Sequence, residues 1–180
     1  MSAIALLIIV LPLLLWGIFL FNRLVKDRNR VRAAWSDIDV QLTRRHELVP
    51  RLVEAVKAYA GHERATLTAI TELRSQSEAA RHLADKAEVE EQLTAGVQKL
   101  IALAEAYPDL KANQNFLDLQ RELVDIEDFL QYARRFYNGA VRILGTRIET
   151  VPDNIIANLF SFEPAEYFVA EHREAPQVSL

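Results

Sequence analysis

The residues best suited to metal chemistry are four histidines. They are His46, His62, His82 and His172. Only His62 opens a motif, His62-Glu63-Arg64-Ala65-Thr66. Thr66 stands where a zinc-protease helix needs its second histidine, one turn after the first, so that both rings reach one metal ion. We therefore expect no metal site.

The carboxylates and serines form no recognisable catalytic constellation. Asp37 and Asp39 are two residues apart, as are Asp125 and Glu127, and residues at this spacing on a helix point to different faces. Acid–base catalysis instead needs paired carboxyl groups in one cleft. Ser36 has no neighbouring histidine, and neither a GxSxG motif nor a phosphate-binding glycine loop occurs. We expect no catalytic residue, no cofactor and no enzymatic activity.

A second group of polar residues stands where a helix-packing pattern requires apolar ones. Arg45 occupies such a position, and Arg134 and Arg135 lie on a later helix. A buried guanidinium needs a carboxylate partner; alternatively, Arg45 extends its charged head into solvent along its aliphatic stem. The possible partners are Asp39, Glu105 and Glu127. The candidate register or interface residues are Arg45, Asp39, Glu63, Arg134 and Arg135.

The elements that must position these residues are helices. The 180 residues include only five glycines and six prolines, which favours an all-α chain. Apolar residues recur at alternating steps of four and three through residues 24–59 and 112–144, the spacing of a coiled-coil seam. Residues 62–84 and 87–106 have the pattern of shorter helices, and the seam of the second one is expected to begin at Val89 and to continue through Leu93, Val97 and Leu100. We predict an N-terminal transmembrane helix followed by an up-down-up-down antiparallel bundle with two long and two shorter helices.

Several residues predict where these helices bend or end. Pro50 lies inside the first seam, so the helix should kink or restart there while its seam keeps the same register. Gly61 offers a left-handed helix stop, and Asp85 is the expected cap between the shorter helices. Pro108 interrupts the pattern at residues 107–113.

Residues 3–21 have the length and composition of a membrane span. They include no charged side chain, and as a helix they extend roughly 28 Å, close to the thickness of the hydrocarbon layer of a bilayer. A cleavable signal peptide would begin with basic residues and have a shorter apolar run. We therefore predict a retained single-pass anchor.

The basic residues after this segment predict its orientation. They are Arg23, Lys26, Arg28, Arg30 and Arg32, and they give residues 23–32 a net charge of +4. The positive-inside rule then places the N-terminus outside and the bundle on the cytoplasmic side of the inner membrane. Basic residues at this position also attract anionic lipids, or they serve only to set the topology.

The rest of the chain excludes other classes of partner. Residues 52–180 carry 13 basic and 21 acidic side chains, so we expect no nucleic acid partner, because phosphate binding needs a clustered cationic surface. The absence of cysteine excludes disulfides, thiolate metal sites and a cysteine nucleophile.

The predicted domains are an anchor at 1–22, a bundle at 23–151 and a C-terminal segment at 152–180. The C-terminal segment holds four aromatic candidate docking residues, Phe160, Phe162, Tyr167 and Phe168. Because the last long helix returns toward the membrane, we expect residues 154–168 to dock at the base of the bundle or on a neighbouring subunit. The remaining tail is expected to be loose.

Three stretches behind the membrane segment resemble the LemA family of bacterial proteins. They are AAWSDIDVQLTRRHELVPRLVEAVKAYAGHE (33–63), YPDLKANQNFLDLQREL (107–123) and RRFYNGAVRILGTRIETVP (134–152). The resemblance covers about residues 3–168, implies a membrane-anchored helical bundle and supplies no catalytic residues. Arg51, Gly139 and Gly145 depart from the family pattern, and the two glycines are expected to let the last long helix bend or fray.

These observations favour a non-enzymatic scaffold of the bacterial envelope. We expect it to bind membrane lipids and to form a homo-oligomer, or to bind another envelope protein, through exposed seams. The alternative is an adaptor that presents clients to a membrane protease or a lipid-remodelling system.

Overall fold

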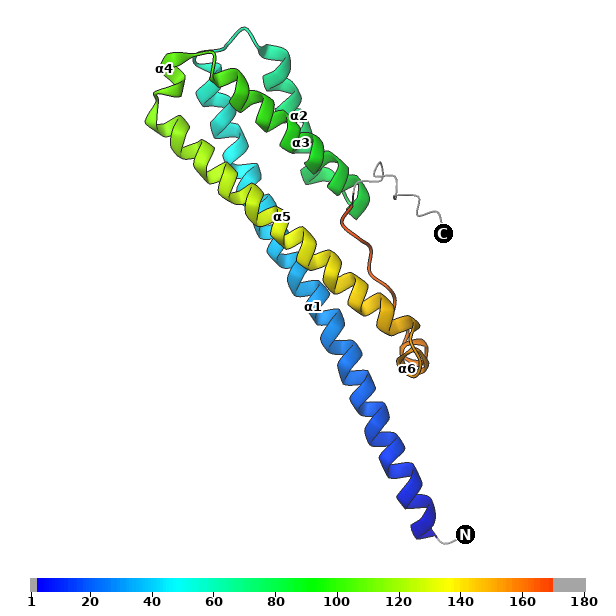
Figure 1. The fold of residues 1–180 in the computed structure, drawn as a ribbon. Coiled ribbons are helices and arrows are strands. Elements are labelled where there is room, and N and C mark those ends of the chain that lie inside the picture. The colour runs from blue at the N-terminus through cyan, green and yellow to red at the C-terminus, as the bar shows by residue number, and fades with distance from the viewer. Residues whose placement is uncertain (1–2, 170–180) are drawn as a thin grey trace, which may run out of the picture. The chain divides into compact units, whose positions relative to one another are not determined.

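The computed structural model describes residues 3–169 (Figure 1). This range contains six helices and no strand, so the predicted all-α fold is confirmed. The helices are α1 (Ala3–Lys57), α2 (Arg64–Ala79), α3 (Leu83–Ala104), α4 (Pro108–Lys111), α5 (Gln114–Glu149) and α6 (Asp153–Leu159). The predicted loose tail falls on residues 170–180, outside the described residues.

The described chain forms two compact units. Unit 1 contains residues 3–37 and 135–166, and unit 2 contains residues 38–134 and 167–169. The helices α1 and α5 each contribute residues to both units. Each unit has its own buried core and is described by itself.

Unit 2 is a helical bundle, in which segments of α1, α2, α3 and α5 alternate in direction (Figure 1). It contains residues 38–134 of the bundle predicted at 23–151. Its buried seams follow the predicted spacing on the two long helices. They comprise Ile38, Leu42, Val49, Leu52 and Val56 on α1, and Phe116, Leu119, Leu123, Ile126, Leu130 and Ala133 on α5. Apolar residues at this spacing are buried together because they lie on one face of a helix.

The helix ends in unit 2 differ from the predictions. The helix α1 continues through Pro50 without a restart, because Val49 and Leu52 are fully buried beside it and their packing outweighs one lost backbone hydrogen bond. Gly61 has no positive φ, so the predicted left-handed stop is wrong. Asp85 lies in the first turn of α3, whose N-cap is His82, so the predicted cap is wrong as well.

Unit 1 has a core in which the C-terminal segment packs against α1 and α5. Leu24, Ala157 and Phe162 are its buried centre, surrounded by Phe21, Val25, Ile148 and Ile156. The Phe21 ring lies 4.7 Å from the Phe160 ring and 5.8 Å from the Phe162 ring. The Tyr137 hydroxyl donates a hydrogen bond to the Glu166 carbonyl oxygen at 2.9 Å. Residues 153–166 are thus held within the chain itself.

The first turns of α1 carry the apolar segment. This helix contains an 18-residue window that is long and apolar enough to cross a membrane, and 11% of the window is buried within the structure. The core helix of a soluble protein would bury most of such a window, whereas here large side chains such as Leu7 and Phe19 are exposed. The segment therefore suggests a single-pass membrane protein.

Two glycines in the unit 1 part of α5 allow a stability prediction. A Cβ atom added at Gly139 or Gly145 would meet no atom within 4 Å, and α5 continues to Glu149. Because glycine costs a helix about 1 kcal/mol relative to alanine, the double change Gly139→Ala and Gly145→Ala should raise the free energy of unfolding by about 1–2 kcal/mol. Thermal unfolding of the solubilised chain, followed by circular dichroism, measures it.

Gly96 provides the matched control for this prediction. A Cβ there would lie 3.2 Å from Ile70 Cγ1, at the contact between α3 and α2. Gly96→Ala should therefore raise the free energy of unfolding less than either glycine change on α5, because Ile70 must move to make room for the new methyl group. Equal stabilisation by all three changes would contradict the argument.

Candidate functional site

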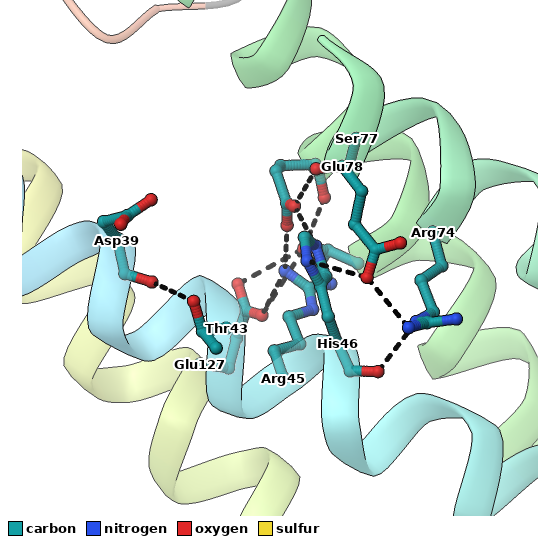
Figure 2. Close-up of polar contacts among 10 residues, drawn as sticks. Asp39, Thr43, Arg45, His46, Arg74, Ser77, Glu78 and Glu127 are labelled. Atoms are coloured by element: carbon teal, nitrogen blue, oxygen red, sulfur yellow. Dashed lines mark hydrogen bonds and ion pairs between the residues drawn. The ribbon is translucent and has the colours of Figure 1, made fainter.

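A group of buried and half-buried polar side chains lies inside unit 2, where the four helices of the bundle face one another (Figure 2). We call it the polar cluster. It consists of Arg45 and His46 from α1, Ser77 from α2, Glu90 and Thr94 from α3, and Glu127 from α5. Arg45 is 2% exposed and Glu90 is 0% exposed, so the predicted alternative in which Arg45 extends into solvent is wrong.

Glu90 is the acceptor at the centre of the cluster. Its Oε1 accepts a hydrogen bond from His46 Nε2 at 2.6 Å and a short one from the Ser77 hydroxyl. Its Oε2 lies 3.2 Å from Arg45 Nη1. Because a carboxylate only accepts, His46 must carry its proton on Nε2. One carboxylate thus ties α3 to α1 and α2.

Arg45 connects the cluster to α5. Its Nη1 lies 3.4 Å from Glu127 Oε2, and its Nη2 donates to the Thr94 hydroxyl at 2.8 Å. The Thr94 hydroxyl donates in turn to the Glu90 carbonyl oxygen at 3.0 Å. The guanidinium therefore contacts two carboxylates and one hydroxyl, which offsets much of the cost of burying its charge.

A second set of contacts fixes the main chain of α1 against α2. Arg74 Nε donates to the His46 carbonyl oxygen at 2.8 Å, and Arg74 Nη2 lies 2.8 Å from Glu78 Oε1 (Figure 2). Glu78 is 44% exposed, so this outer pair is screened by water and contributes little to stability.

Burial and pairing act against each other on the ionisable groups of the cluster. Burial alone would raise the pKa of the Glu90 carboxyl, but hydrogen bonds from His46 and Ser77 and the charge of Arg45 outweigh it and hold that pKa below its usual value. Burial lowers the pKa of the Arg45 guanidinium, although Glu90 and Glu127 act in the opposite direction. Glu90 is therefore a carboxylate in the folded protein at neutral pH.

The lowered pKa of Glu90 predicts how stability depends on pH. The group adds stability that is fully present above its ordinary pKa of 4.5 and is lost as the pH falls through the lower pKa of the folded state. The stability difference between the native chain and Glu90→Gln should therefore shrink as the pH falls below 4.5. Denaturant unfolding of both proteins measures it, and a difference that stays constant would contradict the assignment.

The arrangement is suited to fixing the alignment of four helices. Every member of the cluster contacts another member, and Glu90 has no exposed surface through which to reach a substrate. A pocket of about 240 Å³ lies beside it, lined in part by Arg45, Thr94 and Glu127, but these three side chains already contact one another. Among the described residues, no group of three or more His, Asp or Glu side chains could hold a metal ion.

The candidate register residues are only partly brought together. Arg45 and Arg134 lie close enough that the charge of Arg134 helps to lower the pKa of Arg45, and the Arg134 guanidinium stands 5.2 Å from the centre of the Phe168 ring. Asp39 is exposed, and its carbonyl oxygen accepts a hydrogen bond from Thr43. The side chains of Glu63, Arg135 and Glu105 are also exposed. Of the three carboxylates expected as partners of Arg45, only Glu127 forms an ion pair with it among the described residues.

Glu90 and Ser77 were not predicted as site residues, and His46 was predicted only as one of four isolated histidines. The expected seam of the third helix began at the apolar residue Val89, which is only half-buried. The buried residues of α3 are instead Ala87, Glu90, Leu93, Val97, Leu100 and Ala104. Their steps of three and four place Glu90 in the seam, so the spacing contained the signal. Ser77 lies at the same kind of position, seven residues after Ile70 on α2.

The basic residues after the apolar segment lie along α1 in unit 1. Arg28 stands over the Phe162 ring at 4.9 Å and Arg30 over the Phe136 ring at 5.2 Å. Arg23, Lys26 and Arg32 are exposed. Two of the five predicted topology residues thus also hold aromatic side chains in place.

The four C-terminal docking candidates have different surroundings. Phe162 and Phe168 are 7% and 5% exposed. Phe160 is 53% exposed although it contacts Phe21, and Tyr167 is 50% exposed. Phe162 is therefore the main apolar contact of the segment in unit 1.

A family model and a relative that covers most of the chain both belong to one protein family. The model of the LemA family matches residues 34–180. Protein LemA of Metamycoplasma hominis is 28% identical over 169 residues, which cover 90% of this chain and 77% of that protein. The magnetosome proteins MamQ 1 and MamQ 2 of Paramagnetospirillum magneticum are each 31% identical over 70 residues, which cover 39% of this chain and 26% of either protein.

Proposed function

Because the chain belongs to the LemA family, and membership of this family suggests a membrane-associated protein, we propose that it is a scaffold of the bacterial inner membrane. The proposed scaffold is not an enzyme, and it associates with copies of itself. Residues 3–21 anchor it, and the basic residues that follow keep the bundle on the cytoplasmic side. The three parts predicted from the sequence, 1–22, 23–151 and 152–180, remain part of this proposal.

The observation that carries self-association is an exposed aromatic pair on α5. Phe129 and Tyr132 are three residues apart on one face of the helix and are 54% and 62% exposed. Adjacent large apolar side chains on the surface of a bundle are typical of protein interfaces. Helices with a second apolar stripe beside their core seam commonly pack against another copy.

The polar cluster supports a structural role for the interior of the bundle. Its charges pair with one another and fix the register of α1, α3 and α5. A rigid bundle presents its outer face in one fixed geometry, which a scaffold requires.

Self-association is tested by measuring the mass of the detergent-solubilised chain by light scattering at micromolar concentration. We expect an oligomer, and we expect the double change Phe129→Ser and Tyr132→Ser to convert it to a monomer. Val40→Ser is the matched control, because Val40 is also 54% exposed but lies on α1. A native chain that is already monomeric would overturn the proposal.

The orientation is tested by labelling single cysteines, which is clean because the chain has none of its own. Ser75 is exposed on α2, so Ser75→Cys should be protected from an impermeant maleimide in intact cells and labelled after permeabilisation. Labelling from outside intact cells would reverse the assigned orientation.

A further inference from the structure

A basic pocket lies in unit 1, directly after the apolar segment. Its volume is about 480 Å³, and its lining includes Arg23, Arg142, Thr146, Arg147 and Asp153. Arg23 comes two residues after the end of the uncharged run at 3–21. If that run spans the hydrocarbon layer, the pocket opens at the level of the lipid headgroups.

The charges around this pocket leave two arginines available for a ligand. Arg147 is held from within, because its Nε lies 2.5 Å from Asp27 Oδ2 and its Nη1 lies 3.9 Å from Asp153 Oδ1. Arg23 and Arg142 are exposed and form no ion pair with any described residue. A guanidinium presents several N–H donors in a planar fork that matches the oxygens of a phosphate group.

An exposed apolar surface on α6 adjoins the end of the apolar segment. A Cβ atom at Gly17 would lie 4.0 Å from Ile156 Cδ1, and Phe160 packs against Phe21. The helix α6 is therefore level with residues 17–21. Ile155 and Leu159, one turn apart on α6, are 62% and 72% exposed. Side chains of this kind are stable when exposed at the depth of the outer acyl chains.

From these contacts we infer that unit 1 binds an anionic phospholipid. The phosphate group of the lipid lies in the pocket between Arg23 and Arg142, and its acyl chains contact Ile155 and Leu159. This inference rests on the membrane anchor of the proposed function and is independent of self-association.

The full chain is reconstituted in nanodiscs that contain phosphatidylglycerol or phosphatidylcholine. Native mass spectrometry then measures how much of each lipid stays bound to the chain. We expect retained phosphatidylglycerol in preference to phosphatidylcholine. Arg142→Gln should weaken phosphatidylglycerol binding about fivefold, the effect of removing one basic residue at a membrane surface. Arg135→Gln is the matched control, because Arg135 is also exposed on α5 but lies outside the pocket.

Three outcomes would overturn the inference. The first is equal binding of the two lipids, and the second is an equal effect of the two arginine changes. The third is displacement of the lipid by inorganic phosphate alone, which would assign the pocket to a free anion. Failure of the chain to enter nanodiscs at all would instead contradict the anchor, so the two proposals fail in different ways.

A fluorescent label tests the depth of α6 separately. Ile155→Cys carrying bimane should be quenched by lipids with a nitroxide on the acyl chain. Asp37→Cys is the control, because Asp37 is exposed on α1 in the same unit, roughly 24 Å along the helix from Phe21. Equal quenching at the two positions would contradict the placement of α6 at the membrane.

Discussion

Replacing Glu90 by alanine is expected to lower the free energy of unfolding by about 3–5 kcal/mol. The change leaves Arg45, which is 2% exposed, without its closest carboxylate, and it removes the acceptor of His46 and Ser77. Arg45 keeps Glu127 at 3.4 Å, but its buried charge loses the closer of the two carboxylates that offset its desolvation. Denaturant unfolding of the solubilised chain, followed by circular dichroism, measures the change.

Two further variants show whether the loss comes from the buried charge. Glu91→Ala removes the neighbouring carboxylate, which is exposed on α3, and should change stability by less than about 0.5 kcal/mol. The double change Arg45→Met and Glu90→Leu removes both members of the buried ion pair and should be more stable than Glu90→Ala, because apolar residues of similar volume replace the pair. Glu127 loses Arg45 as well, but it is 22% exposed and water can solvate its charge. A double variant that is less stable than Glu90→Ala would refute this explanation.

Replacing Phe162 by alanine should release the C-terminal segment from unit 1. Phe162 is 7% exposed, packs with Leu24 and Ala157, and lies beneath the guanidinium of Arg28. Removal of a buried phenylalanine costs about 3–5 kcal/mol. Amide hydrogen exchange in residues 153–162 of the solubilised chain should therefore accelerate by about two orders of magnitude or more.

The exposed Tyr167 supplies the comparison. Tyr167→Ala removes an aromatic side chain of similar size that is 50% exposed, and exchange in residues 153–162 should stay close to that of the native chain. Rapid exchange throughout this segment in the native chain would show that it does not dock, whatever the effect of the substitutions.

Local periodicity was sufficient to predict most of the helical architecture. On α5 the steps of four and three correctly assigned Phe116, Ile126, Leu130 and Leu144 to the buried face, because one face of a long helix is fixed by spacing alone. The same spacing did not predict burial correctly beyond the end of a regular helix. Tyr59, placed in the first seam, follows the end of α1 and is 41% exposed.

The polar cluster shows where reasoning from residue type was insufficient. Arg45 stood out because an arginine occupied a seam position, but its main partner was passed over because Val89 next to it is apolar. Whether a glutamate can be buried depends on donors that other helices bring to it. His46 and Ser77 are 44 and 13 residues away from Glu90 in the chain.

The sequence by itself determined the apolar segment, the helical class and the faces that the long helices bury, because each depends on residues a few positions apart. Only the tertiary structure decided that Glu90 pairs with Arg45, that Phe162 is buried while Phe160 is half exposed, and that Arg142 joins Arg23 at one pocket. These outcomes depend on side chains from separate helices meeting at distances of a few ångströms, and the periodicity of one helix contains no information about the rotation of its neighbour.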